Sequence, residues 1–418
     1  MVSSTLHRRA LLKGAAAVSA LPLLGLAQRG QAAESPVTLT IANVQWLDAL
    51  RGKKLWNALL RYQNVAPHVT LVQEAIPAAA FGDKITTELG AGQGPDILIM
   101  ADTLFYAFAD AGALAPLDQA VKGVELNATN EGGVIKGERF GVTWQRVGYA
   151  LIYNKKLLDA AGASVPASVD DLITQARKVS AATGAVGFAA RHLMNDFNNW
   201  TDNFQTWAFG HDTHWVDAGG KLTIDTPEAA AAMEAFKKVY DAKIMAIGDD
   251  MPTQRARFKA NKVAFAIDNS GSTLNIVSGG DLKSADTFAA PLPFKHPGAF
   301  DQIFIGVNAN SPRQEAAMDF IRWFVGAEAQ QALRDASGPD TLATDVPINP
   351  DFAAANPWAE TFLTIAPTER STLIPGHEAQ TLQIMRPVMQ ALSRVLVSEE
   401  EIATALAEAQ QQVDALHL

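Results

Sequence analysis

The 418-residue chain contains no cysteine, so no disulfide can stabilise it and no N-terminal cysteine can carry a lipid. Its stability must therefore come from a large hydrophobic core. The chain also lacks any cluster of lysine and arginine, and its net charge is -10. Nucleic acids and anionic membranes bind clustered cations, so we expect neither as a partner. After residue 32, no apolar run approaches the about 20 residues that span a bilayer.

Catalytic and metal-binding motifs are missing as well. The sequence has no nucleophile elbow of the form Gly-x-Ser-x-Gly, no His-Glu-x-x-His and no cysteine nucleophile. His211 and His214 have a spacing that could hold a metal on a helix, but no third ligand accompanies them. We therefore expect no enzyme activity, no metal and no cofactor.

The first 32 residues have the pattern of an export signal. Arg8 and Arg9 precede an apolar run over residues 14–27, and small residues follow near Ala32. A twin-arginine pair before a short hydrophobic segment is typical of a signal that a translocase reads before the segment is removed. A buried or spanning helix is the alternative, but the run is too short to cross a bilayer. We expect a periplasmic protein without a lipid anchor.

The remaining length is enough for two domains, and the local patterns indicate an α/β fold. Short β-branched runs alternate with amphipathic stretches, an order that builds layered α/β domains. The runs that predict strands are 37–41, 69–72, 97–100, 151–153, 263–267 and 303–307. Helix starts are predicted at Thr226-Pro227 and at two capping boxes, residues 311–314 and 398–401.

Four segments in order carry a resemblance to a known family. They are Gly92 to Leu98, Phe105 to Leu117, Gly148 to Leu158 with the helix start at Ser168, and Phe258 to Phe265. From Val37 to the C-terminus the chain resembles the solute-binding proteins of ABC importers, the class that includes the maltose-binding type. Asn261 stands where the last of these segments usually has glycine.

The resemblance implies a two-lobe α/β fold with mixed sheets flanked by helices and a central ligand cleft. About three crossings would join the lobes, near residues 144–148, 296–302 and 323–329. Lobe 1 would comprise residues 34–145 and 300–326, and lobe 2 residues 146–299 and 327–418. The implied function is capture of a carbohydrate or polyol and its delivery to ABC transporter permease subunits in the inner membrane. We expect a monomer.

Polar and aromatic side chains are the candidate ligand contacts. Most of them lie at strand ends, where open α/β sheets bind ligands, or on the crossings that the resemblance implies. Trp200, Asn203 and Trp207 form an aromatic and amide cluster at helical spacing, and the resemblance aligns Arg386 with an arginine that faces the solute in the maltose-binding subgroup. These candidates are Gln45, Trp46, Asp102, Trp144, Gln145, Arg146, Trp200, Asn203, Trp207, Asn269, Ser270, Phe300, Asp301, Gln302 and Arg386. For several of them a structural role is the alternative. Trp46 could pack in the core, Asp102 could cap a helix, Trp200, Asn203 and Trp207 could lie on a buried helix, and Arg386 could be solvated.

Two other functions stay open. The same fold could bind a cationic polyamine through Asp102 and Asp301, or an acidic compound through Arg146 and Arg386. An exported glycan hydrolase would need two carboxylates across a cleft, about 5 to 9.5 Å apart. Gly271 stands where the maltose-binding subgroup carries a stacking tryptophan, which argues against an oligosaccharide.

Overall fold

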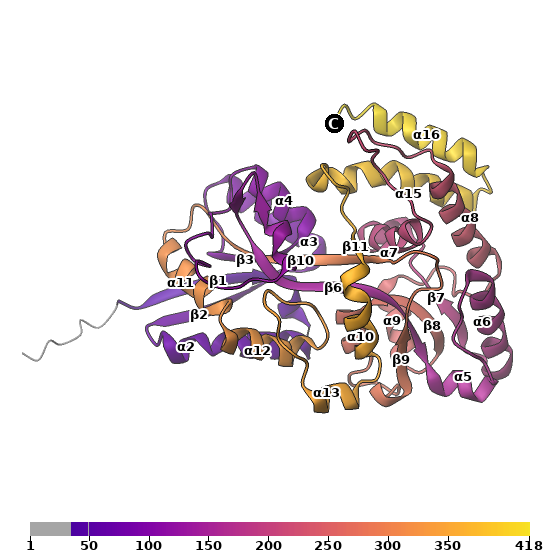
Figure 1. Cartoon of the computed structure of the whole chain (residues 1–418), viewed down its shortest axis with the longest axis horizontal. Helices are drawn as coiled ribbons and strands as arrows, with labels where there is room; N and C mark the ends of the chain where they lie inside the picture. The colour runs from indigo at the N-terminus through magenta and orange to yellow at the C-terminus, as the bar shows by residue number, and fades with distance from the viewer. Residues whose placement is uncertain (1–34, 49) are drawn as a thin grey trace, which may run out of the picture. The chain divides into compact units, whose positions relative to one another are not determined.

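Nine strands form one continuous mixed sheet that runs through the part of the chain from Pro36 to Leu418 (Figure 1). The computed structural model describes residues 35–48 and 50–418, so the predicted export signal lies outside the described residues. The strands of the main path, in spatial order, are β2 (Val69–Ala75), β1 (Val37–Asn43), β3 (Ile97–Ala101), β10 (Ala299–Val307), β6 (Val142–Asn154), β8 (Val263–Asn269) and β7 (Val186–Ala189). Strand β11 (Arg370–Ser371) pairs with β10, and β9 (Thr287–Ala290) pairs with β6.

The strands pair in parallel at the two ends of the sheet and antiparallel at its centre. Strand β1 is parallel to both β2 and β3, and β7 is parallel to β8. The two long central strands, β10 and β6, are antiparallel to each other and to their outer neighbours β3 and β8. All six predicted strands are confirmed, and each is longer than its predicted run or part of a longer strand.

Helices cover both faces of this sheet (Figure 1). Their bounds are α1 (Arg51–Leu60), α2 (Tyr62–Val65), α3 (Ala78–Gly90), α4 (Asp102–Asp110), α5 (Lys155–Ala161), α6 (Val169–Thr183), α7 (Phe197–Gly210), α8 (Pro227–Asp241), α9 (Met251–Lys259), α10 (Ser270–Ile276), α11 (Gln314–Phe324), α12 (Ala327–Ser337), α13 (Pro350–Ala355), α14 (Ala359–Ile365), α15 (Thr381–Val397) and α16 (Ile402–Asp414). Short 3₁₀ turns include η1 (Val44–Leu47), η3 (Met194–Asp196), η5 (Ala366–Thr368) and η6 (Glu378–Gln380), and β4 (Val134–Ile135) pairs with β5 (Glu138–Arg139). No helix among residues 35–48 and 50–418 is both long and apolar enough to cross a membrane.

The buried side chains form cores around two groups of elements, which we call lobe 1 and lobe 2. In lobe 1, strands β1, β3 and β10 carry one core against α1, α11 and α12 and another against α3 and α4. In lobe 2, strands β6 and β8 pack against α6, α7, α8, α15 and α16, and a smaller core lies with α10 and α14. Strands β6 and β10 contribute buried residues to both lobes, and Figure 1 shows them running from one group to the other.

Local sequence signals explain some helix starts and not others. Thr226 accepts a hydrogen bond from the Ala229 N–H at 3.1 Å, and Pro227 is the first residue of α8, as predicted. The two predicted capping boxes are wrong. The Ser311 hydroxyl donates to buried Asp96 and accepts the Arg313 N–H at 3.0 Å, and α11 begins at Gln314 without a side-chain cap. Ser398 ends α15, donating its N–H to the Arg394 carbonyl at 2.8 Å, and no side chain caps α16.

The segment 327–342 contributes its buried apolar side chains to lobe 1. Helix α12 lies against α1, and its residues Leu333 and Ala336, together with Leu342, belong to the core around β1 and α11. Phe352 of α13 packs against the smaller core of lobe 2.

Candidate functional site

Two of the predicted carboxylates meet where β3 ends beside β10. Ala101 is opposite Ile303, so Asp102 comes to lie next to Gln302, whose N–H donates to Asp102 Oδ2 at 3.2 Å. Asp102 Oδ1 also accepts the Thr103 N–H at 2.8 Å, as the first residue of α4. On β10, Asp301 Oδ2 accepts the Tyr149 hydroxyl at 2.8 Å, and Asp301 Oδ1 is buried without a partner among the described residues.

A third carboxylate, Asp202 of α7, joins this pair, and we call Asp102, Asp202 and Asp301 the carboxylate cluster. Burial, and then the charge of Asp301, raise the pKa of Asp102 to about 7. Burial raises the pKa of Asp301 to about 6, against the hydrogen bond from Tyr149. Burial and the charges of the other two members raise the pKa of Asp202 well above its usual range. Among the described residues no lysine or arginine forms an ion pair with any of the three.

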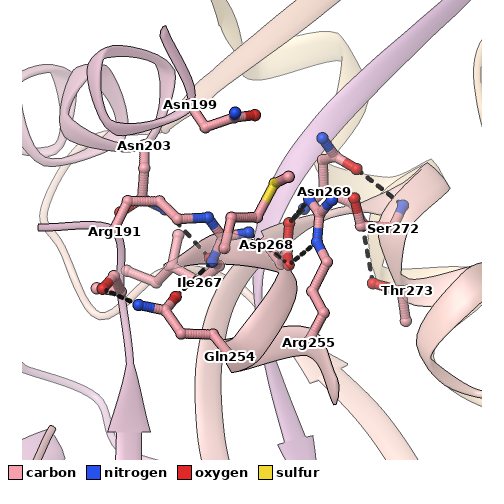
Figure 2. A network of polar contacts seen from close by, with 12 residues as sticks. Arg191, Asn199, Asn203, Gln254, Arg255, Ile267, Asp268, Asn269, Ser272 and Thr273 are labelled. Carbon is pink, nitrogen blue, oxygen red and sulfur yellow. Dashed lines mark hydrogen bonds and ion pairs between the residues drawn. The ribbon is translucent and has the colours of Figure 1, made fainter. Parts of the chain in front are cut away.

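A further buried carboxylate, outside the carboxylate cluster, lies in the opposite electrostatic environment (Figure 2). Asp268, at the end of β8, accepts Arg191 Nη2 at 2.8 Å and the Nε and Nη2 of Arg255 at 2.9 and 2.8 Å. Gln254 accepts the other terminal nitrogen of Arg191 at 2.8 Å. Burial alone would raise the pKa of Asp268, but the charges of Arg191 and Arg255 hold it well below its usual range.

A chain of amides connects the start of lobe 1 to β6. Gln45 Nε2 donates to Gln145 Oε1 at 2.9 Å, and Gln145 Nε2 donates to the Ser337 hydroxyl at 2.8 Å. The Trp144 indole N–H donates to Gln45 Oε1, also at 2.9 Å. The structure thus brings the predicted residues Gln45, Trp144 and Gln145 together, although they are about one hundred residues apart in the chain.

The predicted tryptophans lie in the cores. Trp144, Trp200 and Trp207 are 0% exposed, and Trp46 is 8% exposed. Aromatic neighbours cover their rings, with Trp144 stacked on Phe324 at 5.6 Å between ring centroids. The other ring contacts are Trp46 with Trp56, and Trp200 and Trp207 with Phe236. In this conformation these indoles offer little or no surface for stacking, which is the packing alternative that the sequence left open.

The other predicted residues are held by specific partners. The Arg146 guanidinium lies 3.5 Å from the Phe300 ring centroid, and the exposed Arg386 lies 4.2 Å from that of Phe197. Asn269 caps α10, and Ser270 donates its hydroxyl to Asp340. The remaining two residues bond backbone groups, Asn203 to the Ile267 carbonyl at 3.1 Å and Gln302 to the Thr129 carbonyl at 2.7 Å.

Gly271, where the resemblance leads one to expect a stacking tryptophan, faces an arginine from lobe 1. A Cβ atom at Gly271 would lie 2.6 Å from Arg51 Nη1. Arg51 Nη2 donates to Asp340 at 2.8 Å, and nearby Asn275 donates to Asp48 at 2.7 Å. Asp340 also accepts the Ser270 hydroxyl at the start of α10, so Arg51, Asp340 and Ser270 are linked at the place expected for an aromatic ring.

The described residues contain no group of three or more His, Cys, Asp or Glu side chains that could hold a metal ion. His211 Nδ1 is 2.8 Å from the Trp207 carbonyl, and His214 lies beside Arg370, with Nδ1 at 3.2 Å from Nη2. The two predicted candidate metal ligands thus have separate partners.

The family is decided by a match over most of the chain. Residues 49–331 match the family model of bacterial extracellular solute-binding proteins. The chain belongs to this family. A binding protein of Brucella abortus (strain 2308) is 26% identical over 232 residues, 54% of this chain and 54% of its own length, so this chain spans about half of that relative. The diacetylchitobiose binding protein DasA of Streptomyces coelicolor is 24% identical over 299 residues, 66% of this chain and 68% of DasA.

The fold of this solute-binding protein is shared with a solved receptor. The GacH receptor of Streptomyces glaucescens, solved without ligand and with acarbose, superposes with a TM-score of 0.80. The match covers 92% of this chain and 99% of the receptor, at 22% identity. It confirms the predicted two-lobe α/β fold with a mixed sheet flanked by helices.

Four residues of the solute-binding protein were not identified from the sequence. Tyr149 and Asp202 lie at the carboxylate cluster, and Arg51 and Asp340 lie beside Gly271. Asp202 stands between Asn199 and Asn203 on the same helix, so a polar residue there was a signal that the sequence offered. Tyr149 is part of a segment used only for the resemblance. Arg51 and Asp340 are 289 residues apart and nothing local links them.

Proposed function

We propose that this solute-binding protein is the receptor component of an ABC importer. It captures a carbohydrate or polyol between its lobes and delivers the solute to permease subunits in the inner membrane. The observation that supports the proposal is the set of buried carboxylates, Asp102, Asp202 and Asp301, beside the junction of β3 and β10, with no ion-pair partner among the described residues. Buried carboxylates and amides bind hydroxyl groups strongly, and a solute that leaves them unpaired is rejected.

The relatives support a sugar-like solute. DasA is named for diacetylchitobiose, and the GacH receptor was solved with acarbose. With indoles buried in both lobes, affinity for the solute would come mainly from hydrogen bonds and less from aromatic stacking. This fits Gly271 in place of a stacking tryptophan.

Thermal unfolding with a panel of sugars and polyols tests the solute class, because a ligand that binds only the folded protein raises its Tm. We expect a clear rise with at least one sugar or polyol. No rise with any of them, together with a rise for another class of solute, would overturn the proposal.

A cationic solute in the same site is the second candidate, favoured by one observation. The carboxylate cluster has no cationic partner among the described residues, whereas Asp268 has two. An ammonium group would supply the missing charge. Adding polyamines to the same thermal panel decides between the two, since a neutral sugar and a polyamine would not both be preferred.

We propose lobe bounds that follow the packing of the cores. Lobe 1 comprises residues 36–145, with the part of β10 beyond Gln302 and the chain to residue 342. Lobe 2 comprises the rest, with crossings in β6, in β10 and between residues 342 and 352. A labelled pair of residues on α4 and α15 would report, by a distance change on solute addition, whether the lobes close.

We further propose that the protein does not catalyse a reaction on its solute. Carboxyl groups that converge could serve a glycosidase, so turnover of chromogenic glycosides is the direct test. We expect none. Activity that Asp102→Asn or Asp301→Asn abolishes would establish the hydrolase instead.

The export route is also a proposal. Arg8 and Arg9 would direct the chain through the twin-arginine pathway to the periplasm, where it would act as a monomer without a lipid anchor. Replacing both arginines by lysine should retain the protein in the cytoplasm, while Lys13→Arg should not. Export of the double variant at the normal level would exclude this route.

A further inference from the structure

Two polar contacts join lobe 1 to lobe 2 outside the strands that cross between them. Asn275 of α10 donates Nδ2 to Asp48 Oδ2 at 2.7 Å. Ser270, the first residue of α10, donates its hydroxyl to Asp340 Oδ1, on the segment that follows α12. Helix α10 packs in the smaller core of lobe 2, whereas α1 and α12 pack in lobe 1. We call these two contacts the interlobe bridge.

Both acceptors of the interlobe bridge are held in place by other groups of lobe 1. Asp48 Oδ1 accepts the N–H groups of Leu50 and Arg51 at 3.0 and 2.9 Å, and Asp340 Oδ2 accepts Arg51 Nη2 at 2.8 Å. Burial alone would raise the pKa of Asp48, but the hydrogen bonds from the Arg51 N–H and Asn275 lower it. The acceptor is therefore ionised at pH 7, and hydrogen bonds to ionised groups are the strong ones.

The backbone of α10 also lies directly against lobe 1. A Cβ atom at Gly271 would be 2.6 Å from Arg51 Nη1 and 2.8 Å from Nη2, so the guanidinium group rests on this glycine. A larger residue at position 271 would separate α10 from α1 or displace the guanidinium group from Asp340. Glycine thus permits the close approach that brings Ser270 and Asn275 to their acceptors.

The carboxylate cluster acts in the opposite sense. Asp102 begins α4 in lobe 1, Asp202 lies on α7 in lobe 2, and Asp301 lies on β10. After burial, the charges of Asp301 and Asp102 raise the pKa of Asp202, so the acids of the two lobes are close enough to repel one another when ionised. Helix α4 also lies against η6, which leads into α15 of lobe 2. The structure therefore shows the lobes closed, although like charges favour their separation.

We propose that the interlobe bridge holds the solute-free protein in this closed conformation, against the repulsion within the carboxylate cluster. Asp48, Asn275, Ser270 and Asp340 are then positioning residues, which keep the two sides of the solute site together without touching the solute. A receptor binds more tightly when more of its molecules are in the binding-competent conformation, so the bridge raises the affinity for the solute. This consequence for affinity rests on the proposed function, whereas closure without solute does not.

The test measures the distance between the lobes in the absence of solute. The chain has no cysteine, so Asp110→Cys on α4 and Gln383→Cys on α15 supply two unique thiols at exposed positions. Spin labels on these thiols report the distribution of distances by pulsed electron paramagnetic resonance. With the bridge intact we expect one dominant distance, which matches the structure. A solute-free distribution dominated by a longer distance would overturn the proposal.

One charge change should break the bridge, and a second change should restore it. Asn275→Asp puts a second carboxylate opposite Asp48, and the ratio of open to closed molecules should rise about 10- to 100-fold, because a charge-assisted hydrogen bond is lost. Adding Asp48→Asn supplies an amide donor to the new carboxylate at position 275 and should return the ratio to that of the original protein. A folding defect would not be repaired by the second substitution, so failure of this rescue contradicts the bridge.

Two further variants define the effect. Asn310→Asp makes the same chemical change at an exposed position of lobe 1 and should leave the distances unchanged. Ser270→Ala removes the donor to Asp340 while Asn269 still caps α10, and it should raise the open fraction about 3- to 10-fold. Equal distributions for Asn275→Asp and Asn310→Asp would refute the role of the bridge. If the bridge variants open but no sugar or polyol binds any of these proteins, the proposed function fails and the closed solute-free conformation stands.

Discussion

The carboxylate cluster and the Asp268 network are two ways of burying acids in the same protein. Asp268 accepts hydrogen bonds from two arginines, and its pKa is well below the usual value. Asp102, Asp202 and Asp301 have no cation of their own among the described residues, and their pKa values are raised. The first arrangement stabilises the fold, and the second weakens it unless something else binds there.

The difference separates structural from functional polar groups. A buried charge is tolerated when it is paired and hydrogen-bonded, so the Asp268 network needs nothing further. A set of acids that repel one another is retained only if it does something that apolar residues could not. The cluster lies at the strands that pass from one lobe to the other. This position suits carboxylates whose hydrogen bonds the bound solute completes.

The largest effect should come from removing a cation of the Asp268 network. Arg191→Leu leaves Asp268 with Arg255 alone, and we expect the free energy of unfolding to fall by about 3–5 kcal/mol, because a buried charge loses a partner. Urea unfolding measures it. Arg322→Leu, which removes an exposed cation paired with Asp319, is the control and should cost about 1 kcal/mol or less. Equal losses in both variants would remove the distinction between the two regions.

A smaller effect is expected for solute affinity. Asp301→Asn removes a charged acceptor, and the Kd for the sugar or polyol with the largest thermal shift should rise about 10- to 100-fold. Asp110→Asn, on the surface of lobe 1, should leave the Kd unchanged. An unaltered Kd in Asp301→Asn would mean that the cluster does not contact the solute.

The cluster should also make stability depend on pH in a definite direction. A raised pKa in the folded state means that the unfolded chain loses the Asp102 proton first, so the original protein loses stability as pH rises from about 4 to 7. Asp102→Asn lacks this loss, so its free energy of unfolding relative to that of the original protein should rise between pH 4 and pH 8, by up to about 4 kcal/mol. Urea unfolding at pH 4 and pH 8 checks it. A difference that is the same at both pH values would contradict a titrating Asp102.

The smallest effect belongs to an acid that is paired but exposed. Asp159 forms an ion pair with Lys155 on the surface of α5, and Asp159→Asn should change the free energy of unfolding by about 0.5 kcal/mol or less. This variant tests whether burial, and not pairing alone, gives the Asp268 network its effect. A loss as large as that of Arg191→Leu would show that pairing is sufficient.

A feature could be predicted from the sequence when the residues that determine it lie close together in the chain. The start of α8 follows from Thr226 and Pro227, two neighbouring residues, and it was predicted correctly. The predicted caps at Ser311 and Ser398 failed because α11 begins only at Gln314 and α15 extends to Ser398. Ser311 instead donates its hydroxyl to Asp96, 215 residues away. Asp102 and Asp301 were found because each follows or lies on a recognisable strand, whereas Asp202 lies within a helix on which the tryptophans and Asn203 drew attention.

The sequence by itself determined the α/β alternation, the six strands and the family, because periodicity and short motifs involve residues that are close together in the chain. Only the tertiary structure decided that the indoles of Trp144, Trp200 and Trp207 face the cores, that Arg51 lies over Gly271, and that three acids one hundred residues apart share one site. The register of β3 and β10 brings Asp102 beside Gln302, and the packing of α1, α7 and α10 on the sheet makes the other contacts. Register and packing are properties of pairs of elements that no single segment carries.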